Sequence, residues 1–242
     1  MDRYATGSDT GRNSAKVGDR GGGCVESRTR RIACGQTRFA VQKKSLHATE
    51  RDTEANQKRR EEFIEKIRTI SPNRLIYLDE CGITTSMTRL YARASGGSRI
   101  YEGTPDSRWK MLTILGALST RGIVAAMTIE EATDGDIFLA YLDHCLCPQL
   151  RKGDVVVMDN LSSHKAAGVE QRIEKCGAEV LYLPPYSPNL NPIEKAWSKM
   201  KGLLRSAKAR SQEALDQALT ELLPMITPEN ASAWFKHCIG GL

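Results

Sequence analysis

The segment Leu183–Glu194 reads LPPYSPNLNPIE, and it holds four of the nine prolines in the 242-residue chain. Proline lacks the backbone N–H and clashes with the preceding helical turn, so this segment can be neither helix interior nor central strand. The apolar stretch AEVLYL before it predicts a short strand, and IEKAWSKMKGLLR after it has the apolar spacing of a helix. The sequence therefore predicts a stiff loop that joins a strand to a helix and delivers Glu194 to the first helical turn.

The rest of the chain predicts alternating strands and helices on both sides of this loop. Strands are expected at 74–80, 154–159 and 179–184, a hairpin over 110–119 and 122–130, and helices over 53–70, 134–150 and 162–177, the last closed by Gly177. Three helical stretches follow residue 192. This order predicts an α/β protein with a mixed sheet flanked by helices.

Composition excludes several classes of protein. Hydrophobic residues make up 40% of the chain, yet no apolar run reaches the roughly 20 residues of a membrane span, and the N-terminus has no apolar secretory core. Seven cysteines form no disulfide or zinc pattern, which favours thiols in a reducing cytoplasm. The net charge of +6 comes from residues 1–44, which hold ten Lys or Arg and four acids. Residues 1–38 are Gly-rich and lack apolar periodicity, which predicts a disordered basic tail; such a tail either binds nucleic acid or is merely solvated.

Three acids stand at the ends of predicted elements. Asp79 closes the first strand, Asp159 closes VVVMD, and Glu194 opens the helix after the proline loop. Strand ends and helix starts carry ligand sites in α/β sheets, and converging carboxylates favour Mg²⁺ or Mn²⁺. The residues alone leave an alternative open for each acid. An Asp after a strand is often a turn residue, and Asn191, Pro192 and Glu194 have the shape of a capping box.

Three blocks resemble the signature blocks of mariner-like DDE transposases, with the six-thirty family of bacterial insertion sequences most similar. The blocks are LIYLDECG, VVVMDNLSSHK and LYLPPYSPNLNPIEKAWSKMK, with 34 residues between Asp159 and Glu194, and the resemblance runs from about Lys43 to the C-terminus. It implies a ribonuclease-H-like fold that cuts and joins transposon DNA. Asp79, Asp159 and Glu194 are then the catalytic ligands of two Mg²⁺ or Mn²⁺ ions.

Polar residues around the second and third acids are candidate DNA contacts. They are Asn160, His164, Lys165, Lys195, Lys199, Lys201 and Arg205. Glu194, Lys201 and Arg205 share one face of the last-mentioned helix, where a carboxylate followed by cations suits a metal followed by phosphates. The alternatives are a turn role for Asn160, an exposed helix histidine at 164 and a solvated cationic face. Trp197 falls on the opposite face, predicted to be core.

The resulting domain plan has a disordered tail over 1–44, a linker helix over 45–72 and a DDE catalytic domain over 73–242 with its C-terminal helices. Residues 1–38 lack the helix-turn-helix with which such transposases read element ends, as expected of an out-of-frame or truncated segment. Expected partners are element-end and target DNA, a second copy on DNA, and a helix-turn-helix product of an upstream frame. The expected location is the bacterial cytoplasm, at the nucleoid when bound to DNA. Two rival functions remain: a non-catalytic DNA-binding remnant that inhibits a full-length enzyme, and a general nuclease of the same fold.

Overall fold

A computed structural model describes residues 33–34, 37–38, 47–104, 110–130 and 133–240. The chain divides into two units, 1–46 and 47–242. In the first, β1 (Ala33–Cys34) pairs antiparallel with β2 (Thr37–Arg38), a small ladder that the sequence did not predict. The remainder of the tail, where disorder was predicted, lies outside the described residues.

The second unit is built on a five-stranded mixed sheet. Its spatial order is β5-β4-β3-β6-β7, with bounds Gly122–Ile129, Met111–Ser119, Leu75–Thr84, Val155–Met158 and Glu179–Tyr182. The pairs β5–β4 and β4–β3 are antiparallel, whereas the pairs β3–β6 and β6–β7 are parallel. The predicted strands and the predicted hairpin are confirmed, and the fold is the expected ribonuclease-H-like mixed sheet.

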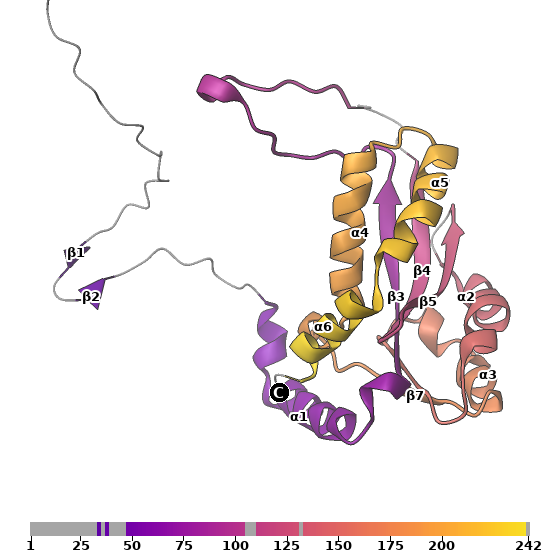
Figure 1. The fold of residues 1–242 in the computed structure, drawn as a ribbon. Coiled ribbons are helices and arrows are strands. Elements are labelled where there is room, and N and C mark those ends of the chain that lie inside the picture. Colours follow the sequence, from indigo (N-terminus) through magenta and orange to yellow (C-terminus); the bar gives the residue numbers. More distant parts are fainter. Residues whose placement is uncertain (1–32, 35–36, 39–46, 105–109, 131–132, 241–242) are drawn as a thin grey trace, which may run out of the picture. The chain divides into compact units, whose positions relative to one another are not determined.

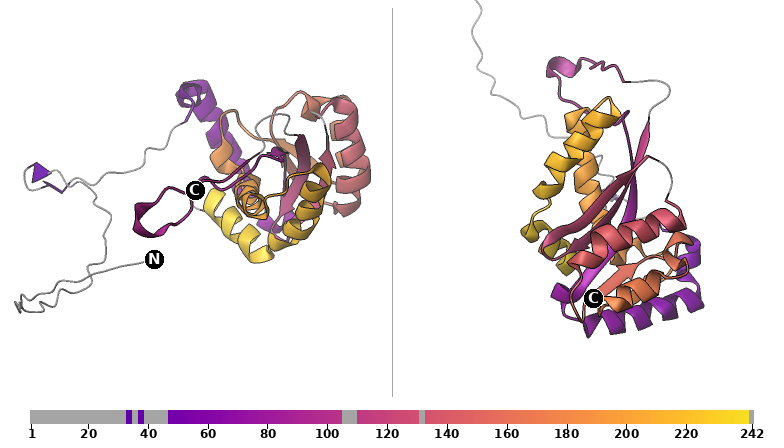
Figure 2. Two further views of the ribbon diagram at one scale, coloured as in Figure 1. Left: turned by 90° about the horizontal axis from the view of Figure 1, so that it is seen from above. Right: turned by 90° about the vertical axis from the view of Figure 1, so that its right-hand side faces the viewer.

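Helices cover both faces of this sheet (Figures 1 and 2). Helices α4, α5 and α6 (Ile193–Ala207, Gln212–Leu222 and Pro228–Cys238) contribute to one hydrophobic core with β3, and α1 (Glu54–Arg68) joins it through Phe63 and Ile67. Helices α2 and α3 (Gly135–Tyr141 and Val169–Lys175) build a second core on the other face. Helix α1 is thus packed into unit 47–242 through these two side chains.

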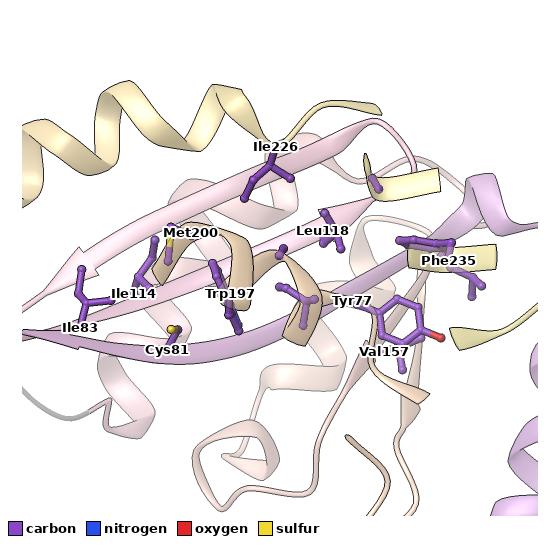
Figure 3. Packing of buried hydrophobic residues seen from close by; sticks show 14 of the residues in the cluster. Tyr77, Cys81, Ile83, Ile114, Leu118, Val157, Trp197, Met200, Ile226 and Phe235 are labelled. Atoms are coloured by element: carbon purple, nitrogen blue, oxygen red, sulfur yellow. The ribbon is translucent and has the colours of Figure 1, made fainter. Parts of the chain in front are cut away.

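The two cores follow from the alternation of side chains along β3. Tyr77, Cys81 and Ile83 point into the first core, and Ile76 and Leu78 into the second. Figure 3 shows the first core, where the Trp197 ring from α4 lies among side chains of the sheet. The prediction that Trp197 is a core residue is therefore confirmed, since its side chain is only 3% exposed.

Two expected helices differ from the prediction. The segment after α2 continues as a π-helical turn, Leu142–Leu146, and a 3₁₀ turn, Cys147–Gln149. The expected helix over 162–177 is divided: a 3₁₀ turn spans Ser163–Lys165, and α3 begins only after Gly168, whose φ of 94° lies in the left-handed region. Gly177 does close α3, with φ of 77°, as predicted. Among the described residues, no helix is long and apolar enough to span a bilayer.

Candidate active site

Asp79 and Asp159 occupy equivalent positions on neighbouring parallel strands. The β3–β6 ladder ends with Tyr77 opposite Val157, and each aspartate follows two residues later. Two residues along a strand restore the same face, so both carboxyl groups point toward the side that α4 covers. The expectation that Asp79 ends its strand is wrong. Strand β3 continues to Thr84 because its other edge stays paired with β4, while β6 stops at Met158.

Glu194 reaches these aspartates because α4 packs closely on the sheet. Trp197, one turn after Glu194, lies against Gly116 of β4, the residue directly opposite Asp79 in the ladder. A Cβ at Gly116 would lie 2.9 Å from Cζ2 of the Trp197 ring and closer still to its Cη2. The absence of a side chain at Gly116 thus allows α4 to lie close to the sheet beside Asp79.

The three acids line a single pocket of about 580 Å³, and the proline loop forms its opposite wall. Burial raises the pKa of Asp79 to about 7; the N–H of Glu80 counteracts this, and the nearby charges of Glu194 and Asp159 raise it further. Asp159 is affected differently. Burial acts to raise its pKa, but hydrogen bonds from His164 and from the Leu161 N–H keep that pKa below its usual value.

The capping-box alternative for Glu194 does not match the structure. The N-cap of α4 is Pro192, and no side-chain hydrogen bond caps this helix. Asn191, which was expected to be the cap, is 5% exposed, and its Nδ2 donates a long 3.4 Å hydrogen bond to Oδ2 of Asp79. The exposed carboxylate of Glu194 is therefore not engaged on its own helix.

His164 is fully buried and lies behind the site. Its Nδ1 is 2.7 Å from Oδ1 of Asp159, and its Nε2 is 3.7 Å from Oε1 of Glu80. Burial lowers the pKa of His164, but these two carboxylates outweigh it and raise the pKa to about 9. A buried imidazolium of this kind orients Asp159 and cannot reach a DNA phosphate, so neither the predicted DNA contact nor the exposed helix position matches the structure.

The proline loop is fastened to α1 by Arg60. This side chain is 9% exposed and donates to Oγ of Ser187 and, at 3.3 Å, to Oδ1 of Asn189. The loop also contains Tyr186, whose φ of 56° is unusual for a residue with a side chain. Four prolines and two hydrogen bonds from the buried Arg60 guanidinium leave this loop little conformational freedom. The stiff loop therefore fixes the position at which α4 begins.

The other candidate DNA contacts fall into two groups. Asn160, Lys165 and Lys195 are exposed, although Nδ2 of Asn160 also donates to the Leu183 carbonyl at 2.6 Å. Lys199 instead fastens α4 to the segment before α6, since its Nζ donates to the carbonyl of Met225 at 2.7 Å and to Oδ1 of Asn230. That engagement argues against a DNA role for Lys199.

Lys201 and Arg205 are half-buried on the face of α4 that begins with Glu194. Burial raises the pKa of the Cys81 thiol, and the nearby positive charge of Lys201 opposes that rise. Lys201 therefore lies over β3, beside the strand residues that follow Asp79.

Sequence reasoning missed three residues that support the site: Glu80, Asn191 and Arg60. Glu80 is the second acid of LDE, and alternation along the strand would have pointed it away from Asp79. Arg60 lies three residues before Phe63 and seven before Ile67, so helical periodicity already puts this cation on the buried face of α1. No sequence signal distinguishes an Asn191 that donates a hydrogen bond to Asp79 from an Asn191 that caps α4.

The donor set suits a hard divalent cation because the pocket offers carboxylate oxygens and no thiolate. Among the described residues, no three His, Cys, Asp or Glu side chains are gathered closely enough to hold one ion together. Asp79, Asp159 and Glu194 are the carboxylates that could hold such a cation, since all three line this pocket.

A mixed sheet with parallel β3 and β6, covered by helices and carrying acids over one pocket, defines a ribonuclease-H-like nuclease fold. Residues 74–216 match the family described as DDE superfamily endonuclease. This match covers more than half of the chain, so the chain belongs to the DDE superfamily of endonucleases.

Solved structures of the Mos1 transposase share the fold. The Mos1 paired-end complex with the left transposon end has a TM-score of 0.67 at 19% identity and covers 83% of this chain and 66% of that chain. The catalytic domain of Mos1 mariner transposase has a TM-score of 0.58 at 18% identity and covers 78% and 94%. Paired-end complexes with Mn and with Mg are also similar, with TM-scores of 0.66 and 0.62.

One curated protein shares sequence with the chain. The human histone-lysine N-methyltransferase SETMAR is 31% identical over 74 residues, which are 30% of this chain and 11% of that protein. The chain thus spans about a tenth of this relative and just under two thirds of the Mos1 chain in the paired-end complex.

Proposed function

We propose that this chain is the catalytic part of a transposase that cuts and joins the DNA ends of an insertion sequence. The observation that carries the proposal is the pocket shared by Asp79, Asp159 and Glu194, which brings together the three acids of the family blocks. The alternatives weighed for these acids are weakened, because Glu194 caps no helix and Asp79 lies within a strand rather than a turn.

The residues of the pocket would have distinct tasks. Asp79 would serve as a metal ligand together with Asp159 and Glu194; burial raises its pKa, so without a cation this carboxyl keeps its proton to a higher pH than an exposed aspartate. Asp159 stays ionised and fixed by His164 and Glu80. Glu194 would complete the site from α4. Bound Mg²⁺ or Mn²⁺ would supply an activated oxygen nucleophile and stabilise the leaving oxygen.

The reaction then needs no covalent protein intermediate. Water would attack a phosphodiester at the element end, the P–O bond to the 3′ oxygen would break, and that oxygen would leave as a free 3′-OH. The 3′-OH would in turn attack a target phosphodiester and release another 3′-OH. The exposed Asn160 and Lys195 and the half-buried Lys201 and Arg205 are the remaining candidates for holding the DNA backbone.

Assembly is also part of the proposal. The titles of similar Mos1 structures describe paired-end and strand transfer complexes, which supports action as a dimer on two DNA ends. We further propose that a helix-turn-helix product of an upstream frame takes part in recognising the element ends. The similarity to mariner transposases supports a role in transposition. The proposal that the mobile element is a bacterial insertion sequence rests on the resemblance to the six-thirty family.

The test is nicking of a labelled duplex that carries the element end, in Mg²⁺ and in Mn²⁺. Glu194→Gln removes the charge that a hard cation needs and keeps the size, so we expect a normal melting curve and cleavage reduced by orders of magnitude. Glu213→Gln is the matched control, since Glu213 occupies the first turn of α5 as Glu194 does in α4. We expect this control to cleave as wild type does.

Three other outcomes would each point elsewhere. Equal cleavage by a folded Glu194→Gln protein would remove Glu194 from the site. Cleavage of any duplex regardless of its ends would indicate a general nuclease. DNA binding by wild type without cleavage, even with the upstream product added, would leave a non-catalytic remnant or inhibitor as the function.

A further inference from the structure

A second pocket, of about 500 Å³, lies beside the acid-lined pocket. Helix α1 forms one wall, and the end of β7 with the first residues of the proline loop forms the other. The two pockets share Asn160, Leu183, Pro184 and Pro185 in their linings, so they meet along this ridge. We call this second pocket the α1 groove. A DNA strand that leaves the acid-lined pocket past Asn160 would enter the α1 groove.

The rim of the α1 groove is positively charged. Arg59, Lys66 and Lys165 line it with Glu62 as the single acid among the described lining residues. Among the residues that the structure describes, no ion pair occupies any of these three cations, whereas Arg172, Lys208 and Arg210 elsewhere in the unit are paired with carboxylates. Three unpaired cations around one depression create a positive potential suited to a phosphate.

The floor of the groove is apolar, with an aromatic ring held in place. Its apolar lining residues are Phe63, Leu183 and Pro184, which are buried, and Leu181 and Pro185, which are half-buried, beside Tyr182. The Tyr182 hydroxyl lies 3.1 Å from Oε1 of Glu170 and 3.3 Å from the His164 carbonyl, and Nζ of Lys165 lies 5.6 Å from the centre of its ring. An apolar floor under a cationic rim matches a nucleotide, which has an apolar base face and an anionic phosphate.

We infer that the α1 groove binds an unpaired nucleotide of the DNA strand next to the phosphodiester that is cut. This inference rests on the proposed function, because it takes the acid-lined pocket as the place of cleavage. The volume suits one nucleotide. Base-paired DNA would lie across the rim and leave the apolar floor unused, so the groove selects a strand whose pairing is locally opened.

Binding of single-stranded DNA without cleavage tests the groove. The probe is a short fluorescent single-stranded oligonucleotide, measured by anisotropy in EDTA over a range of salt concentrations. The groove variant is Arg59→Ala/Lys66→Ala/Lys165→Ala. The control is Lys58→Ala/Arg68→Ala/Lys175→Ala, which removes the same charge from the same two regions of the chain but touches no residue of the groove lining.

The groove variant should bind the oligonucleotide at least 10-fold more weakly at low salt. Its slope of log affinity against log salt should fall by about 2, since each phosphate contact to a single strand contributes about 0.7. The control should change affinity less than about 2-fold with an unchanged slope. An abasic nucleotide, scanned along the probe, should weaken binding at one position in wild type and at none in the groove variant.

Two results would overturn the inference: equal losses in the groove variant and its control, or an equal loss for a short duplex and for the single strand. The second would make the rim a surface for paired DNA. Because binding is measured in EDTA, where no cleavage takes place, this test is separate from catalysis. If cleavage fails but the groove still binds the strand, the proposed function falls and the groove remains a single-strand site without its assigned place beside the cut. If cleavage persists and the groove variant and its control lose affinity equally, only the groove inference falls. A wild-type protein that binds no DNA would overturn both.

Discussion

The two acids of LDE, Asp79 and Glu80, are neighbours in sequence and belong to opposite faces of β3. Asp79 lies on the face of α4 and meets Glu194, whereas Glu80 meets His164 from the other face. His164 then bonds back to Asp159. Strand β3 thus supplies the proposed metal ligand Asp79 and, through Glu80 and His164, a support for Asp159. Exchanging the two residues (Asp79→Glu/Glu80→Asp) keeps the charge but should lose both roles.

Stability of the metal-free protein should depend on pH through Asp79. Its folded pKa of about 7 lies above its ordinary value of 3.8, so the folded state binds the proton more tightly. The stability present below pH 4 is therefore lost as pH rises from about 4 to 7. Asp79→Asn cannot ionise, so it should be more stable than wild type at pH 8, by up to about 2 kcal/mol after allowing for solvent in the pocket, and little changed at pH 4.

Urea unfolding in EDTA at both pH values measures this difference. Saturating Mg²⁺ should stabilise wild type at pH 8 and have much less effect on Asp79→Asn, because the variant lacks one carboxylate of the pocket. An Asp79→Asn protein that is less stable than wild type at pH 8 would show that Asp79 is charged at no cost in the folded state. DNA cleavage by Asp79→Asn should be lower than that of wild type by orders of magnitude at any pH.

At the scale of elements, α1 and the proline loop act as one support. Arg60→Ala removes both side-chain bonds to the loop and leaves Ser187 without this donor, so we expect a loss of about 1–3 kcal/mol in the free energy of unfolding. Cleavage should also need a higher metal concentration, because Glu194 is then held less firmly. Lys58→Ala, an exposed neighbour on α1, is the control.

Urea unfolding and a Mn²⁺ titration of nicking give these two quantities separately. Arg60→Lys keeps the charge but not the forked geometry, and should lie between wild type and Arg60→Ala. If the loss of stability occurs with an unchanged metal requirement, Arg60 supports the fold but does not position Glu194.

The contact between Gly116 and Trp197 sets the distance between α4 and the sheet. Gly116→Ala introduces a Cβ that overlaps the Trp197 ring, so we expect about 1–3 kcal/mol of destabilisation and reduced cleavage as α4 moves outward with Glu194. Gly202→Ala is the matched control on α4. No atom lies within 4 Å of its added Cβ, so it should stabilise the helix by about 0.5–1 kcal/mol.

The double variant Gly116→Ala/Trp197→Leu identifies the cause. Leucine at position 197 is smaller than tryptophan and makes room for the methyl group added at position 116. Cleavage by the double variant should therefore recover in part relative to Gly116→Ala alone. Urea unfolding and nicking rates measure both effects. Wild-type stability and cleavage in Gly116→Ala would mean that the helix does not depend on this close approach.

At the scale of the whole molecule, local pattern predicted most of the fold. VVVMD and the 110–130 hairpin became β6, β4 and β5, because their apolar runs fit buried strands whatever the neighbours are. The end of β3 could not be predicted, since the strand lasts as long as β4 pairs with it. The burial of His164 and the turn of Asn191 toward Asp79 likewise depend on segments distant in sequence. The grouping of the three acids was predicted from the resemblance of the three sequence blocks, and their metal-binding role stays a prediction.

All buried core residues of the described sheet and helices lie between Phe63 and Cys238. Deletion of residues 1–46 should therefore leave the melting temperature of unit 47–242 within about 2 °C, because the core of that unit is built from its own residues. It should also lower non-specific affinity for DNA at low salt, since the basic excess of the chain lies in the deleted part. Differential scanning calorimetry checks the first expectation, and a melting temperature lower by 5 °C or more would contradict it.

The bond between Arg60 and Ser187 joins residues 127 positions apart, and this has a consequence for the chain during its synthesis. At about 5–20 residues per second, the partner of Arg60 is added roughly 6–25 s after Arg60 itself. Until then the buried guanidinium has no acceptor, and Asp79 has no Glu194 opposite it. A growing chain is thus expected to be unable to cleave DNA until its last quarter has left the ribosome, and products that stop early would carry two of the three acids without the support that aligns them.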